Sequence, residues 1–145
     1  MAVWGADVKL QAITVMGVRE AWPFVRKGLD SMLEKHQDRW LPEDVYFELM
    51  AGTAFLYIIN HEDEELGFMV VKKFVDFDGL ALFVWIIHAE NGSMKENDRW
   101  KDVMAELDAL AKNVGAKRIR HYSPRGGFGE IGAFDLKMHI YEREV

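Results

Sequence analysis

Apolar residues recur at spacings of three and four between residues 18 and 33, a pattern that predicts an amphipathic helix. The apolar positions are Val18, Trp22, Val25, Leu29, Met32 and Leu33. Pro23 falls inside this segment, and we expect the helix to tolerate it only in the first turn, where its missing N–H costs no hydrogen bond. A second, shorter helix is predicted over residues 41–52, because Pro42 suits a first helical position and Gly52 suits a C-terminal stop.

Short apolar stretches predict strands at residues 9–15, 54–60, 66–75 and 80–88. The links between the last three are short and rich in turn-forming residues, which favours an antiparallel meander. Residues 80–88 are apolar on both faces, which is typical of a central strand covered from both sides.

The rest of the chain predicts a helix over residues 97–113, stopped by Gly115, and strands at 117–123 and 136–144. A dry central strand needs helices on both faces of the sheet. The predicted fold class is therefore α/β (α+β), with a mixed, mostly antiparallel central sheet flanked by helices on both faces. No linker interrupts the pattern, so residues 1–145 are expected to form a single domain.

Composition narrows the function classes. The formal net charge of -6 argues against a general binder of nucleic acid or of anionic membranes, which need a basic surface. No apolar run approaches the roughly 18 residues of a membrane span, and the start of the chain lacks a signal-peptide pattern. There is no cysteine, which excludes thiol catalysis and disulfides. We expect an intracellular, cytoplasmic protein.

The stretch SPRGGFGEIGAF contains the letters of a dinucleotide-binding fingerprint, with glycines at 127, 129 and 132. That fingerprint needs a helix beginning on the glycines, a returning strand and an acidic residue about 20 positions later. Only residues 133–145 follow, and they predict a strand. We therefore interpret the stretch as a turn rather than a phosphate cradle.

Titratable residues give few local signals. No two of the five histidines have helical ligand spacing, so the sequence predicts no metal site. His88 and His121 lie at the ends of predicted strands, where a general base can sit.

Basic residues concentrate in one segment, at Lys117, Arg118, Arg120 and Arg125. Strand alternation would place Arg118 and Arg120 on one face. Three interpretations stay open: a solvated edge, ion pairs with the chain's own acids, or a site for a phosphorylated ligand.

The order of elements resembles that of the GNAT (GCN5-related N-acetyltransferase) superfamily. The stretches that carry the resemblance are PEDVYFELMAGTAFLYII, LGFMVVKKFV, LFVWIIHAENGS, WKDVMAELDALAKNVGAKRIRHYSPRGGF and GAFDLKMHIYERE. More narrowly, the chain is similar to small GNAT-like proteins encoded by bacteriophages, some of which are virion components.

The resemblance implies acetyl transfer from acetyl-CoA to a small-molecule or protein amine. It implies His88 or Glu90 as the base and Tyr122 as the acid that protonates the departing thiolate. It places the cofactor along a strand and the loop after it. The implied cofactor-binding residues are Val84, Trp85, Ile86, Ile87, Asn91, Gly92, Ser93 and Met94.

The loop after residue 88 departs from the family pattern, since it holds one glycine, Gly92, and lacks the usual Q/R-x-x-G-x-G/A spacing. Glu90, Glu96 and Asp98 add negative charge where a pyrophosphate should bind. The glycine stretch also occupies the place of the family's fourth helix, and Phe128 offers no hydroxyl where the usual tyrosine sits. A second hypothesis is therefore a catalytically inactive GNAT-fold binding or structural protein, such as a virion-associated phage protein. Partners that stay open are phage particle proteins and a second copy of the chain in a homodimer.

Overall fold

The structure is a computed structural model that describes residues 8–35, 40–90, 94, 99–121 and 143. The described strands are β1 (Val8–Ile13), β2 (Phe55–His61), β3 (Glu64–Asp76), β4 (Gly79–Ala89) and β5 (Arg118–His121). The helices are the short 3-10 helix η1 (Val15–Gly17), α1 (Val18–Lys35), α2 (Pro42–Ala51) and α3 (Arg99–Val114). Every predicted element within these ranges is present, while the strand predicted at 136–144 lies outside them.

The five strands form one sheet in the order β1-β2-β3-β4-β5. The first four strands pair antiparallel, and β5 pairs parallel to β4. A parallel pair needs a crossover connection, and α3 lies in that connection. The predicted mixed, mostly antiparallel sheet is confirmed.

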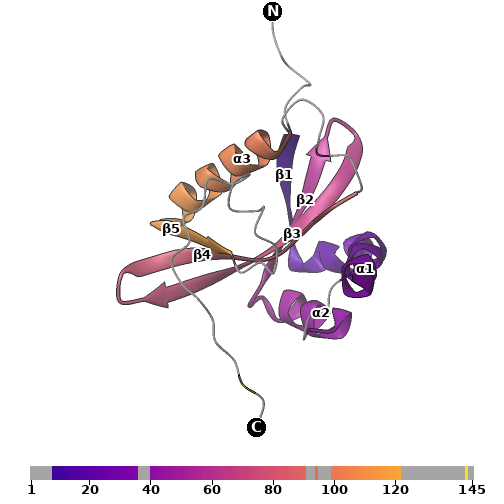
Figure 1. Ribbon diagram of the computed structural model, residues 1–145, viewed down its shortest axis with the longest axis horizontal. Helices are drawn as coiled ribbons and strands as arrows, with labels where there is room; N and C mark the ends of the chain where they lie inside the picture. Colours follow the sequence, from indigo (N-terminus) through magenta and orange to yellow (C-terminus); the bar gives the residue numbers. More distant parts are fainter. Residues whose placement is uncertain (1–7, 36–39, 91–93, 95–98, 122–142, 144–145) are drawn as a thin grey trace, which may run out of the picture.

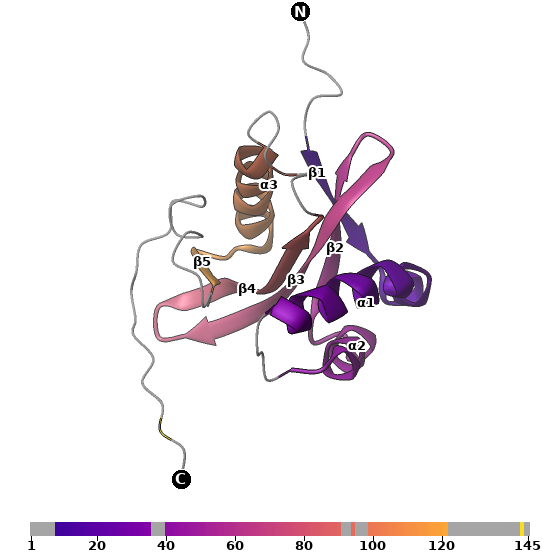
Figure 2. The same ribbon diagram turned by 45° about the vertical axis from the view of Figure 1, so that its right-hand side comes forward.

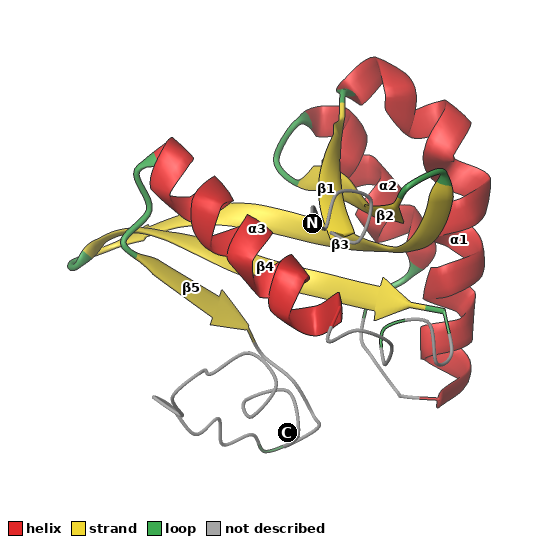
Figure 3. Cartoon of the chain, turned by 90° about the horizontal axis from the view of Figure 1, so that it is seen from above, coloured by secondary structure: helices red, strands yellow, loops and turns green. Residues whose placement is uncertain are grey.

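Helices cover both faces of this sheet, with α1 and α2 on one side and α3 on the other (Figures 1 and 2). Seen from above, α3 runs across the sheet while α1 and α2 stand together on the far side (Figure 3). The carboxylates of α3 also tie it to the edge strand β1, since Asp102 and Glu106 accept hydrogen bonds from the N–H groups of Val8 and Leu10 at 3.3 and 3.2 Å. These bonds occupy backbone donors that an edge strand would otherwise expose.

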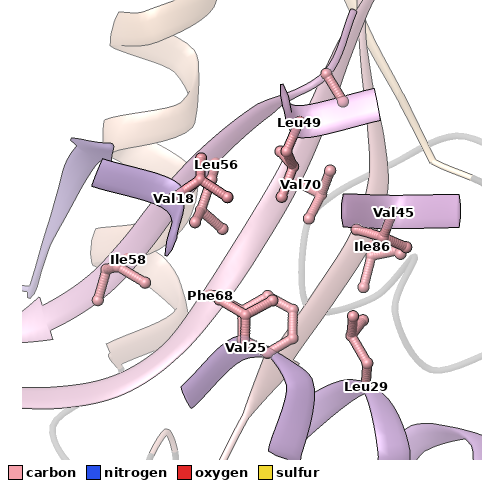
Figure 4. Packing of buried hydrophobic residues seen from close by; sticks show 11 residues of the cluster. Val18, Val25, Leu29, Val45, Leu49, Leu56, Ile58, Phe68, Val70 and Ile86 are labelled. Atoms are coloured by element: carbon pink, nitrogen blue, oxygen red, sulfur yellow. The ribbon is translucent and has the colours of Figure 1, made fainter. Parts of the chain in front are cut away.

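The side chains of β3 alternate between two apolar cores, one on each face of the sheet. Phe68 and Val70 pack against α1 and α2, whereas Met69 and Val71 pack against α3. The first core is shown in Figure 4, and it joins the two helices to β2, β3 and β4. Because β4 contributes to both cores, it is covered on both faces, as its continuous apolar pattern predicts.

Three predicted helix boundaries are confirmed. Pro42 is the first residue of α2, and the Asp44 carboxylate accepts a hydrogen bond from the N–H of Leu41 at 2.8 Å. Gly52 and Gly115 end α2 and α3 with φ of 77° and 81°, values that L-residues with a side chain rarely adopt.

The prediction for Pro23 is wrong, because it is the sixth residue of α1 and so lies in the second turn. A proline there leaves the carbonyl four residues earlier, that of Arg19, without its helical N–H donor. Pro23 and Arg19 are both exposed, so water can hydrate this carbonyl. Exposure to solvent explains why the helix continues through the proline.

Candidate functional site

β4 has a partner strand on each side. Its pairing with β3 runs from Gly79 to Ala89. Its parallel pairing with β5 covers Ala81 to Val84, each opposite one residue of Arg118–His121. His121 is the last residue described in this part of the chain, so Val84–His121 is the last described pair.

A β-bulge lies at the same point. Val71 pairs with Val84 and Val70 pairs with Ile86, so Trp85 is an extra residue in β4. One extra residue reverses the alternation of side chains along a strand. The implied cofactor-binding segment, Val84 to Ile87, thus contains the bulge.

The side chains of this segment belong mainly to the cores. Val84 and Ile86 are buried, and Ile87 packs against the α3 side. The Trp85 ring lies under the ammonium of Lys72, which is 3.8 Å from the ring centroid. Lys72 is held in turn by Glu48 of α2 at 2.8 Å. This segment can therefore offer a ligand its backbone N–H and C=O groups rather than its side chains.

His88 is half-buried beneath α1, with its ring centroid 5.6 Å from that of Phe68. A Cβ at Gly28 would lie 2.8 Å from His88 Cδ2 and would also clash with the Phe68 ring. Gly28 therefore allows α1 to approach the two rings closely. His88 is thus in contact with the α1 side of the sheet.

Glu90 is exposed just past the end of β4, and its N–H donates to the carbonyl of Leu66 at 2.8 Å. This bond continues the β3–β4 pairing by one residue and holds the backbone of Glu90 in place.

The remaining predicted site residues have mixed outcomes. Met94 is buried on the α3 side with Val8, Ile59, Leu66 and Val103, so its side chain is part of the core. The other residues lie outside the described ranges: Asn91, Gly92, Ser93, Tyr122, Arg125 and the glycine stretch.

His121, the last residue of β5, contacts β4 directly. Its ring Nδ1 lies 2.8 Å from the carbonyl oxygen of Val84. Burial lowers the pKa of His121 below its ordinary value of 6.5, and the hydrogen bond to Val84 opposes this effect. The sequence marked His121 as a strand-end histidine, but the contact with Val84 needs the register of β5 on β4, which no local pattern reveals.

The basic cluster pairs with one of the chain's own acids. Asp76 binds Arg118 at 2.9 Å through Oδ1 and Arg120 at 2.6 Å through Oδ2. The backbone N–H of Asp78, joined by the two arginines, lowers the pKa of Asp76, and partial burial opposes this shift. Both arginines lie on one face of β5, as alternation predicts. Their shared partner supports the ion-pair interpretation over a phosphate site.

A separate hollow of about 620 Å³ lies between α1 and α2. Its lining includes Arg19, Trp22, Arg26, Glu43, Tyr46 and Phe47. Glu43 is already paired with Arg26 at 3.0 Å. An amine is cationic near neutral pH and needs a carboxylate, so this hollow suits an amine acceptor poorly.

The described ranges hold no cluster of metal ligands and no helix suited to a membrane. No group of three or more His, Asp or Glu side chains comes together there as a metal site. No described helix is both long enough and apolar enough to cross a membrane.

The sequence matches no protein-family model and no curated protein. Solved structures share its fold. An integron cassette protein from the mobile metagenome of Cole Harbour Salt Marsh aligns with a TM-score of 0.68 at 12% identity, over 97% of this chain and 91% of that one. An integron cassette protein from the mobile metagenome of V. cholerae aligns with a TM-score of 0.67 at 11% identity, over 96% and 93%.

An aminoglycoside acetyltransferase from an uncultured soil metagenomic sample, in complex with sisomicin, aligns with a TM-score of 0.66 at 7% identity, over 97% of this chain and 98% of that one. Identities this low establish a shared fold and nothing finer. The chain has the GNAT-like fold that its sequence predicted.

Proposed function

We propose that this protein is an acyl-CoA N-acyltransferase that transfers an acetyl group from acetyl-CoA to an amine. One observation carries the proposal: in a GNAT-like sheet, β4 has a bulge at Trp85, which leaves this residue out of the β3–β4 ladder. Solved acetyltransferases of the same fold support it.

The end of β4 suits the pantetheine arm of acetyl-CoA. This arm is extended and contains two amide groups, so it can hydrogen-bond along a strand as another strand would. The bulge leaves Trp85 outside the β3–β4 ladder, and its backbone groups are the ones we propose to make such bonds. Acetyl-CoA supplies an activated thioester, and the protein supplies position and proton transfer.

Glu90 and His88 remain the proposed bases from sequence, with Tyr122 as the proposed acid. Glu90 is exposed beside the end of β4, whereas His88 is half-buried against Phe68 and α1. The exposure of Glu90 makes its carboxylate the more accessible of the two.

A second candidate is a GNAT-fold protein without catalysis that serves as a binding or structural part, for example in a phage particle or as a homodimer. The exposed Glu90 carboxylate favours it, together with the negative charges of Glu96 and Asp98 in the sequence that follows. Negative charge at this point opposes the pyrophosphate of acetyl-CoA.

Thermal unfolding with and without acetyl-CoA separates the two candidates. A ligand at 100 times its dissociation constant stabilises the native state by about 2.7 kcal/mol, which for a chain of this size raises Tm by on the order of 10 °C. Acetyl-pantetheine lacks the pyrophosphate, so it is the matched ligand that tests the contacts with β4 alone. No shift with either ligand at millimolar concentration would overturn the acetyltransferase proposal.

A further inference from the structure

The turn between β3 and β4 presents large apolar side chains to solvent, and residues 75–78 are called the hairpin tip below. Phe77 has a relative exposure of 109%, so its ring is as open to solvent as in an extended chain. Val75, two residues earlier, is 74% exposed. Exposed apolar groups that gather in this way are typical of an interaction site.

Hydrogen bonds and ion pairs hold the hairpin tip in one shape. The Asp76 carboxylate accepts the N–H of Asp78 at 2.8 Å and binds both Arg118 and Arg120. Arg118 also donates to the carbonyl oxygen of Asp78 at 3.4 Å. Because the turn is fixed in advance, a partner that binds Phe77 need not pay for ordering it.

The α1–α2 hollow offers an apolar surface of matching size. Trp22, Tyr46 and Met50 line it and also pack against the first core, and the rings of Trp22 and Tyr46 meet edge to face at 4.8 Å between centroids. Phe47 lines it too and is 71% exposed. Its volume of about 620 Å³ lies within the roughly 300–1,000 Å³ of ligand pockets, so it can receive a phenyl ring and a neighbouring side chain.

The charges of the two surfaces are complementary. Arg26 and Glu43 in the hollow neutralise each other, whereas Arg19 forms no ion pair with any residue that the structure describes. The carboxylate of Asp78, next to Phe77, is likewise without an ion-pair partner among the described residues. An apolar ring beside a free carboxylate therefore matches an apolar hollow beside a free guanidinium.

The hairpin tip and the hollow lie at opposite ends of the molecule, so a chain cannot fill its own hollow (Figures 1 and 3). We propose that copies of this protein associate head to tail, with the hairpin tip of one copy in the α1–α2 hollow of the next. Phe77 is the apolar anchor, and Asp78 pairs with Arg19. Such a contact joins two different surfaces, so repetition gives a ring or an open chain. This inference goes beyond the proposed function and does not depend on it.

Sedimentation velocity of the full chain tests the association directly. One tip in one hollow buries less than the roughly 1,200 Å² below which complexes are weak and transient. We therefore expect the sedimentation coefficient of the wild type to rise with concentration between about 10 μM and about 1 mM. The NMR signal of the Trp22 indole N–H should shift over the same range, which places the contact at the hollow.

Two results of these measurements would overturn the proposal. One is a protein that stays monomeric throughout. If phenylpropionate, an aromatic carboxylate, then shifts the Trp22 signal, the hollow is a site for a small anionic ligand instead. The other is an association during which the Trp22 signal stays constant, because the contact then lies elsewhere.

Phe77→Ser tests the anchor. The ring is fully exposed in the single chain, so we expect the fold to persist and the dissociation constant of the association to rise by about 30-fold or more. Met16→Ser is the matched control, since Met16 is 90% exposed and belongs to neither surface. It should leave the association unchanged. Equal association of Phe77→Ser and wild type would exclude the hairpin tip.

Two charge reversals test the pairing of tip and hollow. Arg19→Glu and Asp78→Lys each bring like charges together, so each variant alone should associate about tenfold more weakly. In a mixture of the two, the substituted hollow meets the substituted tip, while the unchanged tip meets the unchanged hollow. Association should therefore recover on mixing. Lys9→Glu makes the same charge change on the exposed part of β1 and should associate like the wild type. A mixture no stronger than its components would contradict the head-to-tail contact.

Discussion

Val84 and Ile86 are two residues apart in β4, yet their side chains are buried in the two different cores on opposite faces of the sheet. In a regular strand such residues share a face. The extra residue between them, Trp85, produces the change, and β3 continues its own alternation across the same point. The irregularity thus lets one strand fill both cores.

Deleting Trp85 should remove the bulge and restore a regular β3–β4 ladder. Val84 and Ile86 would keep their partners on β3, so we expect the fold to persist. Trp85→Ala is the matched control, since it also removes the indole and its contact with Lys72 but keeps the extra residue. Calorimetric titration should show that the deletion lowers the affinity for acetyl-CoA about 100-fold, or by about 2.7 kcal/mol. Trp85→Ala should largely keep the wild-type affinity. Equal affinities for the two variants would show that the bulge does not form the site.

The bulge also marks the limit of what the sequence predicts. Spacing and alternation predicted the helices, the meander and the shared face of Arg118 and Arg120, because each rests on a local contrast between apolar and polar positions. Residues 80–87 are almost all apolar, so no polar residue marks the point where the faces reverse. The sequence could not predict the contact between His121 and Val84 either, because the Val84 carbonyl is a backbone group whose position depends on strand register.

Gly28→Ala should destabilise the protein, although alanine is the better helix former by about 1 kcal/mol. The new Cβ would lie 2.8 Å from His88 Cδ2 and would clash with the ring of the fully buried Phe68. Overpacking of this kind costs about 1–3 kcal/mol, and urea denaturation measures it. In a Phe68→Leu background the same change should cost less, because the ring it meets is gone. If Gly28→Ala lowers stability equally in the Phe68→Leu variant, the strain does not come from contact with the Phe68 ring.

Asp76→Asn should lower stability at neutral pH by removing the carboxylate that Arg118 and Arg120 share. The pKa of Asp76 is below its ordinary value of 3.8 in the folded protein, so the ionised form is the one that stabilises the fold. Its contribution is present above about pH 4 and is lost as the pH falls through the folded-state pKa. The stability difference between wild type and variant should therefore shrink in acid and in high salt. Asp63→Asn, in the exposed β2–β3 turn, is the control for the loss of one negative charge.

His121 should also make stability depend on pH, and the fold again favours the deprotonated form, which in this residue is neutral. Its pKa in the folded protein is below the ordinary 6.5, so just below that pH the unfolded chain binds more protons than the native state. Stability should rise with pH through this window, and the contribution should be complete above about pH 6.5 and lost as the pH falls toward the folded-state pKa. Urea denaturation of wild type and His121→Asn at pH values from about 5 to 8 isolates the effect, since asparagine does not titrate. A constant difference between the two proteins across that range would mean that burial does not hold His121 neutral in the folded protein.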